Sequence, residues 1–114
     1  MSHSAMDANA FAEMKELMGD AFKEVIKMTL ETLPQQLEDI KTAIENQNVD
    51  NLFNTSHKMK SSCGTIGAFG LAEKAEAIEI IGRKGSADVS EQIYNELYDA
   101  TQQVISILSA ELDY

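Results

Sequence analysis

The chain has 114 residues, which is enough for one domain with a single modest core but not for two. Hydrophobic residues make up 44% of it, which indicates a globular rather than a disordered chain. Its 19 acidic and 9 basic residues give a net charge of −10, which argues against binding nucleic acid or an anionic membrane surface, since both would repel it.

The sequence carries no sign of export or membrane insertion. No apolar run approaches the roughly 18 residues of a membrane span, and the N-terminus lacks the basic and apolar regions of a signal peptide. The only cysteine, Cys63, falls on an apolar stripe and suits a reducing compartment as a small core residue. We therefore expect a cytoplasmic protein.

Residues 1–9 are polar and irregular, and we expect a flexible N-terminus that is partly derived from cloning. His3, which lies in it, is accordingly a poor candidate for a functional residue. The remaining residues, 10–114, are expected to form one domain. Its first element is a short helix over 10–18 that ends at Gly19. The residues that share one face of this helix are Phe11, Met14, Leu17 and Met18.

A long helix should follow, with Asp20 as its N-cap. Apolar residues recur along it at intervals of three or four and predict one core-facing stripe: Phe22, Ile26, Leu30, Leu33, Leu37, Ile40 and Ile44. Pro34 interrupts this stretch, so either the helix kinks there or a second helix begins near Thr32. The unbroken stripe favours a kink. Residues 46–48 then predict a turn.

Residues 49–66 predict a helix that carries the remaining histidine. When they are projected at the 100° per residue of an α-helix, one side collects Val49, Leu52, Ser56, Met59, Cys63 and Ile66. On this projection His57 lies about 130° from the centre of the apolar stripe, with Lys60, Ser61 and Gly64 within about 60° of it. The imidazole is therefore expected to face water, beside a lysine and two small residues.

Gly64 and the local charge both bear on what this exposed histidine could do. A glycine inside a helix costs about 0.8–1 kcal/mol relative to alanine, and either the close approach of a partner or helix termination near Gly64 or Gly67 could account for it. From Asn51 to Ala72 the chain has Lys58 and Lys60 but no acidic residue. Such a basic segment would favour an acidic partner surface or a phosphoryl group, although two lysines can also cluster by chance.

Two more helices complete the prediction. One follows a connection over 67–70 and turns Leu71, Ala75 and Ile78 inward, with Ile81 or Gly82 as the next inward position, before a basic end and a loop over 83–86. The last runs from about 88 to 111, with an inner face of Val89, Ile93, Leu97, Ala100, Val104, Leu108 and Leu112. We therefore predict an all-α fold: an antiparallel four-helix bundle with a short additional N-terminal helix.

Several chemistries are excluded by the residues themselves. Neither glycine-rich nucleotide motif is present, so no ATP site is expected. His57 has no second histidine or acidic ligand at helical spacing, so no metal site is expected. No carboxylate lies within one helical turn to orient the ring as in a hydrolytic triad. What remains is an exposed histidine that can act as a nucleophile in its neutral form.

The segment from His57 to Ala68 resembles the signature of histidine-containing phosphotransfer (HPt) domains, H-x-L-K-G-S-S-x-x-x-G-A. His57, Lys60, Ser62, Gly67 and Ala68 match it, and Met59 replaces leucine conservatively. Ser61 departs, because the family usually has glycine there. Residues 69–79 also resemble the family's next helix, and with the acidic helical segment upstream the resemblance covers nearly all of the chain.

The resemblance implies a phosphorelay intermediate. His57 would accept a phosphoryl group from an aspartyl phosphate in the receiver domain of a hybrid sensor kinase and pass it to a response regulator. The protein would be a carrier rather than an enzyme and a monomer, with no cofactor of its own, because the receiver domain brings the magnesium and most catalytic groups.

Roles for individual residues follow as hypotheses. His57 is phosphorylated through Nε2, and Lys60 stabilises the phosphoryl charge or the docked partner. Lys58 is a weaker electrostatic candidate, and Ser61 and Gly64 give clearance. Residues with other possible partner contacts are Phe53, as a docking hydrophobe, and Ser62 and Thr65, whose hydroxyls could equally bond within the helix.

Two other functions fit the same bundle. It could bind a receiver domain without taking the phosphoryl group, which the departure at Ser61 leaves open. It could also be an acidic structural bundle that only oligomerises, but this would require a large apolar patch outside the core, and no such patch is evident in the sequence.

Overall fold

The computed structural model describes residues 5–112, so the predictions for residues 1–4, including His3, lie outside the described part. Five helices occur in it, and no strand is found between residues 5 and 112. They are α1 (Ala8–Met18), α2 (Ala21–Glu45), α3 (Val49–Thr65), α4 (Phe69–Arg83) and α5 (Glu91–Leu112).

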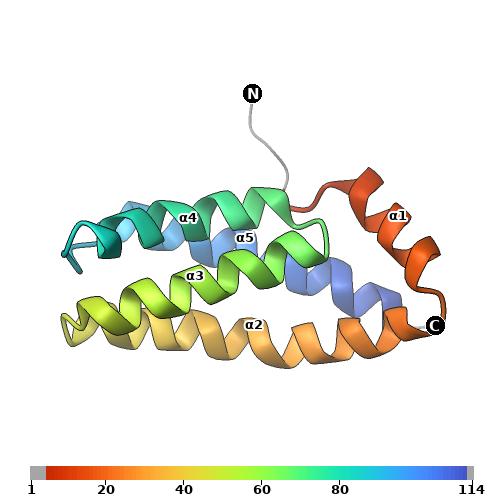
Figure 1. Cartoon of the computed structure of the whole chain (residues 1–114), viewed down its shortest axis with the longest axis horizontal. Helices are drawn as coiled ribbons and strands as arrows, with labels where there is room; N and C mark the ends of the chain where they lie inside the picture. Colours follow the sequence, from red (N-terminus) through yellow and green to blue (C-terminus); the bar gives the residue numbers. More distant parts are fainter. Residues whose placement is uncertain (1–4, 113–114) are drawn as a thin grey trace.

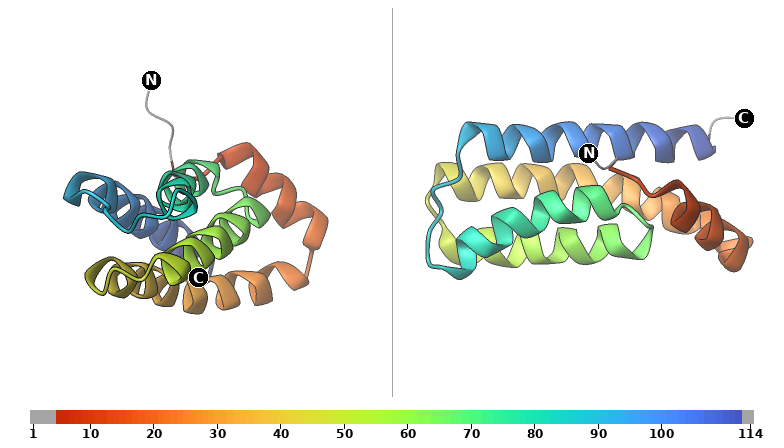
Figure 2. Two further views of the ribbon diagram at one scale, coloured as in Figure 1. Left: turned by 60° about the vertical axis from the view of Figure 1, so that its left-hand side comes forward. Right: turned by 90° about the horizontal axis from the view of Figure 1, so that it is seen from above.

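The four longer helices form an antiparallel bundle (Figure 1). Each runs back along the one before it, and α2 packs on α3, α3 on α4, α4 on α5 and α5 on α2. The shorter α1 lies obliquely at the end of the bundle where α2 begins (Figure 2). This is the predicted all-α fold, a four-helix bundle with an additional N-terminal helix, and that prediction is confirmed.

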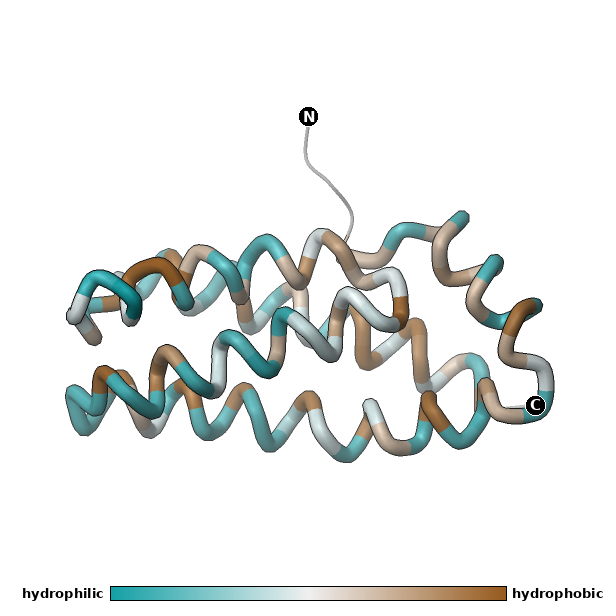
Figure 3. Tube along the Cα trace, in the orientation of Figure 1, coloured by the Kyte–Doolittle hydropathy of each residue, from teal (hydrophilic) through white to brown (hydrophobic). Residues whose placement is uncertain are grey.

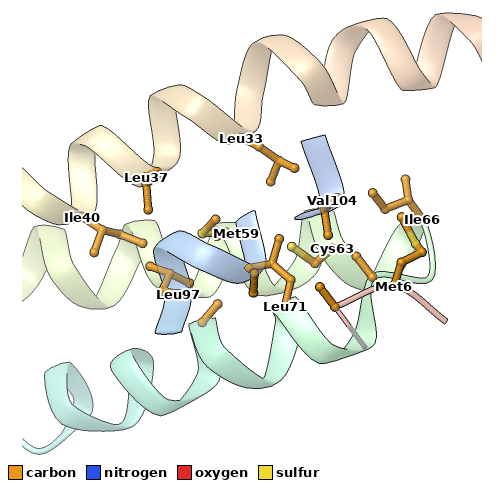
Figure 4. Close-up of a cluster of buried hydrophobic side chains, with 14 of the residues drawn as sticks. Met6, Leu33, Leu37, Ile40, Met59, Cys63, Ile66, Leu71, Leu97 and Val104 are labelled. Atoms are coloured by element: carbon orange, nitrogen blue, oxygen red, sulfur yellow. The ribbon is translucent and has the colours of Figure 1, made fainter. Parts of the chain in front are cut away.

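The core is made by the apolar stripes that the sequence predicted. Hydrophobic and hydrophilic residues alternate along each helix (Figure 3), and the hydrophobic ones turn toward the bundle axis. Side chains from all four long helices meet there, among them Leu33, Leu37, Ile40, Met59, Cys63, Leu71, Leu97 and Val104 (Figure 4). The buried hydroxyls of Ser56 and Thr101 donate hydrogen bonds to carbonyls one turn earlier, so burying them costs little.

Helix α2 is one continuous element across Pro34, so no second helix begins near Thr32. The prediction that Asp20 caps α2 is wrong, because its side chain makes no capping hydrogen bond. Gly19, with φ of 56°, turns the chain so sharply that the backbone of Asp20 is already helical. A residue in that conformation cannot place its side chain over the first free N–H groups.

The predicted flexible N-terminus does not include Ala5 and Met6. Ala5 and Met6 are buried, and Met6 lies beside Ile66 (Figure 4). The amide of Leu71 donates to the Ala5 carbonyl at 3.2 Å, and the amide of Asp7 donates to the Gly67 carbonyl at 2.8 Å. The sequence prediction of irregularity over 5–9 is therefore corrected, since two apolar side chains close one end of the bundle.

Capping side chains explain where two helices begin. Asp7 accepts from the amide of Ala10 and starts α1 two residues earlier than predicted. Ser90 Oγ accepts from the amide of Ile93 at 3.1 Å and starts α5 at Glu91 rather than near residue 88. None of the helices between residues 5 and 112 is both long and apolar enough to cross a membrane.

Candidate functional site

His57 lies in the middle of α3 and points away from the core. Asn48 caps the start of this helix by accepting from the amide of Asn51 at 3.1 Å. Leu52 and Met59 are fully buried on its inner face, so the helix cannot rotate without losing their packing. The imidazole is consequently turned outward, and 54% of the His57 side chain is exposed. This is the position that the spacing predicted.

Phe53, one turn before the histidine, stacks against one side of the imidazole ring. The two ring planes lie 14° apart with centroids separated by 6.0 Å. Phe53 is itself half-buried. It therefore supports the imidazole and also presents an apolar edge to anything that approaches it.

A carboxylate from the neighbouring helix holds the other side of the imidazole. Glu79 of α4 is only 1% exposed, and its Oε2 lies 2.9 Å from His57 Nδ1. An ionised carboxylate can only accept hydrogen bonds, so Nδ1 must carry the proton. In the neutral ring the lone pair is then on Nε2.

Two cations complete the surroundings of Glu79. Arg83 Nη2 donates to Oε2 at 2.9 Å, and Lys60 Nζ lies 2.7 Å from Oε1 as an ion pair without hydrogen-bond geometry. Burial alone would raise the pKa of Glu79, but the adjacent Lys60 ammonium and the hydrogen bonds from His57 and Arg83 outweigh it. Together they lower this pKa from 4.5 to about 2. Glu79 is thus charged at any physiological pH.

The carboxylate reaches the ring because α3 and α4 approach closely. A Cβ added at Gly82 would lie 3.1 Å from the backbone N and Cα of Phe53. A side chain there would require the backbone at Phe53 to shift by a few tenths of an ångström. The glycine that the sequence placed on the inward stripe of α4 therefore sets the distance between His57 and Glu79.

The small residues predicted to leave room for a partner lie beside the histidine on the outer surface of α3. Ser61 and Gly64 are both exposed, and a Cβ added at Gly64 would meet nothing within 4 Å. Helix α3 continues past Gly64 to Thr65, and the chain turns at Gly67, whose φ is 80°. Gly67 is therefore the glycine that ends the helix, whereas Gly64 lies within the helix at a position with free space around it.

The other predicted partner residues are divided between two sides of α3, and Ser62 lies on the side that faces α2, where Gln36 Nε2 donates to its hydroxyl at 3.4 Å. Lys58 is exposed. Ser62 and Thr65 donate to the carbonyls of Lys58 and Ser61, which is the helix-internal bonding that the sequence also allowed. Ser62 and Thr65 also line a shallow groove between α2 and α3, whose other lining residues are Val25, Met28, Thr29, Thr32 and Ile66.

Sequence reasoning missed Glu79 and Arg83. The prediction that no carboxylate orients the ring was limited to residues within one turn of His57, and it did not consider Glu79 of α4, which lies 22 residues away and contacts Nδ1. A signal was present: on a helical projection Glu79 lies about 70° from the centre of the inward stripe of α4, at its edge. A carboxylate so placed needs cationic partners, and Arg83 follows it by one turn.

Metal chemistry has little support in the described residues. Between residues 5 and 112, no three histidine, cysteine, aspartate or glutamate side chains are grouped so as to hold an ion. The carboxylate closest to His57 is already engaged by the ring, a lysine and an arginine.

An exposed imidazole with its proton fixed on one nitrogen, flanked by two cations, is suited to accept an anionic electrophile such as a phosphoryl group. On an antiparallel four-helix bundle, this arrangement defines the class of histidine phosphotransfer domains.

Comparisons with known proteins agree with this class. The family model described as "Hpt domain" matches residues 24–107. Histidine-containing phosphotransfer protein B from Pseudomonas aeruginosa superposes with a TM-score of 0.86 at 19% identity, covering 94% of this chain and 93% of that one. The HPT domain of a sensor hybrid histidine kinase from Shewanella gives a TM-score of 0.78 at 20% identity, covering 95% and 93%. Among curated proteins no sequence match was found.

The chain belongs to the Hpt domain family, since the family model covers most of its length. It is thus a phosphorelay intermediate of two-component signalling, a carrier of phosphoryl groups rather than a kinase. Domains of this family interact with the receiver domains of hybrid kinases and response regulators.

Proposed function

We propose that His57 is the phosphorylated residue and that Nε2 is the atom that forms the bond to phosphorus. The observation that carries this proposal is the contact of Nδ1 with the buried Glu79 carboxylate on a ring that is 54% exposed. Because Glu79 holds the proton on Nδ1, the lone pair of the neutral ring is on Nε2. Nucleophilic attack therefore needs no prior loss of a proton.

Transfer of the phosphoryl group to the domain then requires no separate base. The Nε2 lone pair attacks the phosphorus of an aspartyl phosphate on a receiver domain, the bond from phosphorus to the aspartate oxygen breaks, and the electron pair leaves with the aspartate carboxylate. The ring becomes a cation with hydrogen on Nδ1 and phosphorus on Nε2. In the reverse direction an aspartate oxygen attacks phosphorus and the Nε2 bond breaks.

Lys60 and Arg83 supply positive charge beside the incoming group. The Lys60 ammonium pairs with Glu79 Oε1 without a well-aligned hydrogen bond. The Lys60 side chain is 30% exposed, so N–H groups of its ammonium can reach phosphoryl oxygens while the ion pair with Glu79 is kept. Arg83, which is 59% exposed, donates to Glu79 through one nitrogen and has further N–H groups available.

The receiver domain would approach over the exposed surface of α3. Ser61 and Gly64 leave space beside the ring, and Phe53 offers an apolar edge. Lys58 would add charge at the margin of this surface, whereas Ser62 and Thr65, which line the groove between α2 and α3, would contact a receiver only at its periphery. The receiver would bring the magnesium ion, so this chain would need no cofactor.

We further propose that the domain acts as a monomer in the cytoplasm and binds no ATP, nucleic acid or membrane. The net charge of −10 supports the exclusion of the two anionic partners. Incubation with labelled ATP alone should leave the protein unlabelled, and sedimentation should give the mass of one chain. Stable label from ATP alone would refute the carrier role.

The direct test uses the two histidines of the chain. The protein is incubated with a receiver domain that carries a ³²P-labelled aspartyl phosphate, and the label on each variant is measured after separation. We expect acid-labile, alkali-stable label on the unmodified protein and on His3→Gln, and none on His57→Gln. Label that survives in His57→Gln would refute the assignment. Tight receiver binding without any label would favour the non-catalytic interaction domain.

A further inference from the structure

The buried carboxylate contributes more than a hydrogen bond to His57. Of the groups that lie around the ring, Glu79 alone is both anionic and almost fully enclosed, being 1% exposed. A neutral acceptor would be enough to fix a tautomer. A full negative charge at 2.9 Å from Nδ1 also favours any state in which the ring is positively charged.

The phosphorylated ring is such a state. Once Nε2 carries the phosphoryl group, the proton on Nδ1 decides how readily the group can leave. With the proton present, breaking the bond between Nε2 and phosphorus returns the electron pair to Nε2 and releases a neutral imidazole. Without the proton the same step would release an imidazolate anion, which is a far poorer leaving group.

The charged groups around the ring come from α3 and α4. On α3 they are Lys60, which pairs with Glu79, and Lys58, which follows the histidine in sequence; on α4 they are Glu79 and Arg83. Asp50 lines a hollow beside Arg83. On the flank of α3 that faces α2, Asp39 lines a separate polar hollow with Thr55. Glu79 is thus the carboxylate in contact with the ring.

We infer that Glu79 is a positioning residue whose carboxylate keeps the proton on Nδ1 of the phosphorylated His57, so that the phosphoryl group remains transferable, and also open to hydrolysis, throughout the neutral pH range. The inference rests on the proposed phosphorylation of His57. Its consequence is a labile phosphoryl group that is relayed rather than stored.

Glu79→Gln separates the charge from the hydrogen bond. The glutamine oxygen can still accept from Nδ1, so the tautomer and the Nε2 position are retained while the negative charge is lost. Glu76→Gln, an exposed site on the same helix, removes the same charge without touching the ring and is the matched control.

The experiment loads each protein with the small donor phosphoramidate and follows the loss of phosphohistidine by ³¹P NMR over a range of pH. In hydrolysis a water oxygen attacks phosphorus, the electron pair returns to Nε2, and the water proton passes to the solvent. For Glu79→Gln we expect the hydrolysis rate to fall at a lower pH than it does in the wild type. Near pH 8 the phosphohistidine of the variant should be about tenfold longer-lived than that of the wild type, since one pH unit corresponds to tenfold. Near pH 5 the two lifetimes should be indistinguishable. Glu76→Gln should follow the wild type.

Rates that coincide with the wild type at every pH, or that change by one factor at every pH, would overturn the inference. A second measurement does not depend on the variant folding: ¹⁵N NMR of the phosphorylated wild-type ring should show a protonated Nδ1 beyond about pH 8. Loss of that proton below about pH 7 would also overturn it.

Failure of the proposed relay function can be distinguished from failure of the role inferred for Glu79. If phosphoramidate loads His57 but no receiver domain exchanges phosphoryl groups with it, the relay proposal fails while the pH profile still decides the role of Glu79. If phosphoramidate loads the protein at a residue other than His57, both fail.

Discussion

The chemistry of this domain is concentrated on one half-exposed imidazole and the charges that touch it. Glu79 fixes which nitrogen of His57 holds the proton, and Lys60 and Arg83 balance the buried carboxylate. The two cations are partly exposed, whereas the carboxylate is not. An incoming phosphoryl group can therefore compete with Glu79 for the cations without displacing the carboxylate from the ring.

Removing the lysine should slow phosphotransfer. We expect Lys60→Ala to reduce the transfer rate from a phosphorylated receiver by about tenfold to a hundredfold, because a hydrogen bond to a charged group is worth roughly 1.5–3 kcal/mol. Single-turnover transfer assays measure this rate. Lys41→Ala, which removes an exposed lysine from α2, should leave it unchanged, and an unchanged rate in Lys60→Ala would remove the role proposed for Lys60.

Glu79 should make the stability of the domain depend on pH in acid. Its pKa is about 2 in the folded domain against an ordinary 4.5, so the unfolded chain takes up the proton first. The stabilisation is complete above about pH 4.5 and is lost as the pH falls toward 2. It amounts to on the order of 3 kcal/mol, from 1.36 kcal/mol per pKa unit.

Urea unfolding of the wild type and of Glu79→Gln between pH 2 and 6 tests this dependence. The free energy of unfolding should fall more steeply with acid in the wild type than in the variant. Parallel curves would mean that Glu79 is not stabilised as a carboxylate by its neighbours.

The elements that matter most for the site are α3 and α4, because their separation sets the contact between His57 and Glu79. Gly82 allows the backbone of α4 to approach Phe53. Gly64 lies in the same pair of helices but on the open surface, where nothing opposes a side chain. Gly64 and Gly82 thus serve different purposes, Gly82 in packing and Gly64 at the proposed partner surface.

Alanine at each glycine should have opposite effects on stability. We expect Gly64→Ala to raise the free energy of unfolding by about 0.5–1 kcal/mol through helix propensity. Gly82→Ala should lower it by about 1 kcal/mol net, since forcing a methyl group against the backbone costs about 1–3 kcal/mol.

Chemical denaturation gives both values, and phosphotransfer assays add a second comparison. Gly64→Ala should transfer more slowly although it is more stable, because its methyl group occupies space proposed for the receiver. Equal or faster transfer would show that the receiver does not approach over Gly64.

At the scale of the whole molecule, one core shared by four helices holds the site in place. Leu33 from α2, Met59 from α3, and Leu97 and Val104 from α5 belong to one buried cluster (Figure 4). Apolar side chains outside this core are few among the described residues, and Leu17 on α1 is 88% exposed. The free energy of unfolding should therefore depend on core residues that do not contact the histidine.

Two substitutions of the same residue type test this dependence. Leu33→Ala should destabilise the domain by about 2–5 kcal/mol, because it leaves a cavity among fully buried side chains. Leu17→Ala should change stability by less than about 0.5 kcal/mol, since it removes little buried area. Thermal or urea unfolding measures both. Similar values for the two would contradict the single shared core.

The sequence by itself determined the order of the helices, their inward stripes and the outward direction of His57. These depend on the 3.6-residue period of a helix, which is local and can be read from the spacing of apolar residues. The spacing also predicted that Lys60 and Gly64 share a surface with His57, because all three lie on one helix.

Only the tertiary structure decided what touches the ring. Glu79 and Arg83 belong to another helix, and their distance from His57 depends on how closely α3 and α4 pack, which Gly82 controls. The burial of Ala5 and Met6 likewise depends on the end of the bundle that they close. A periodicity describes one helix at a time, whereas these contacts form between helices, where packing and charge pairing fix which side chains meet.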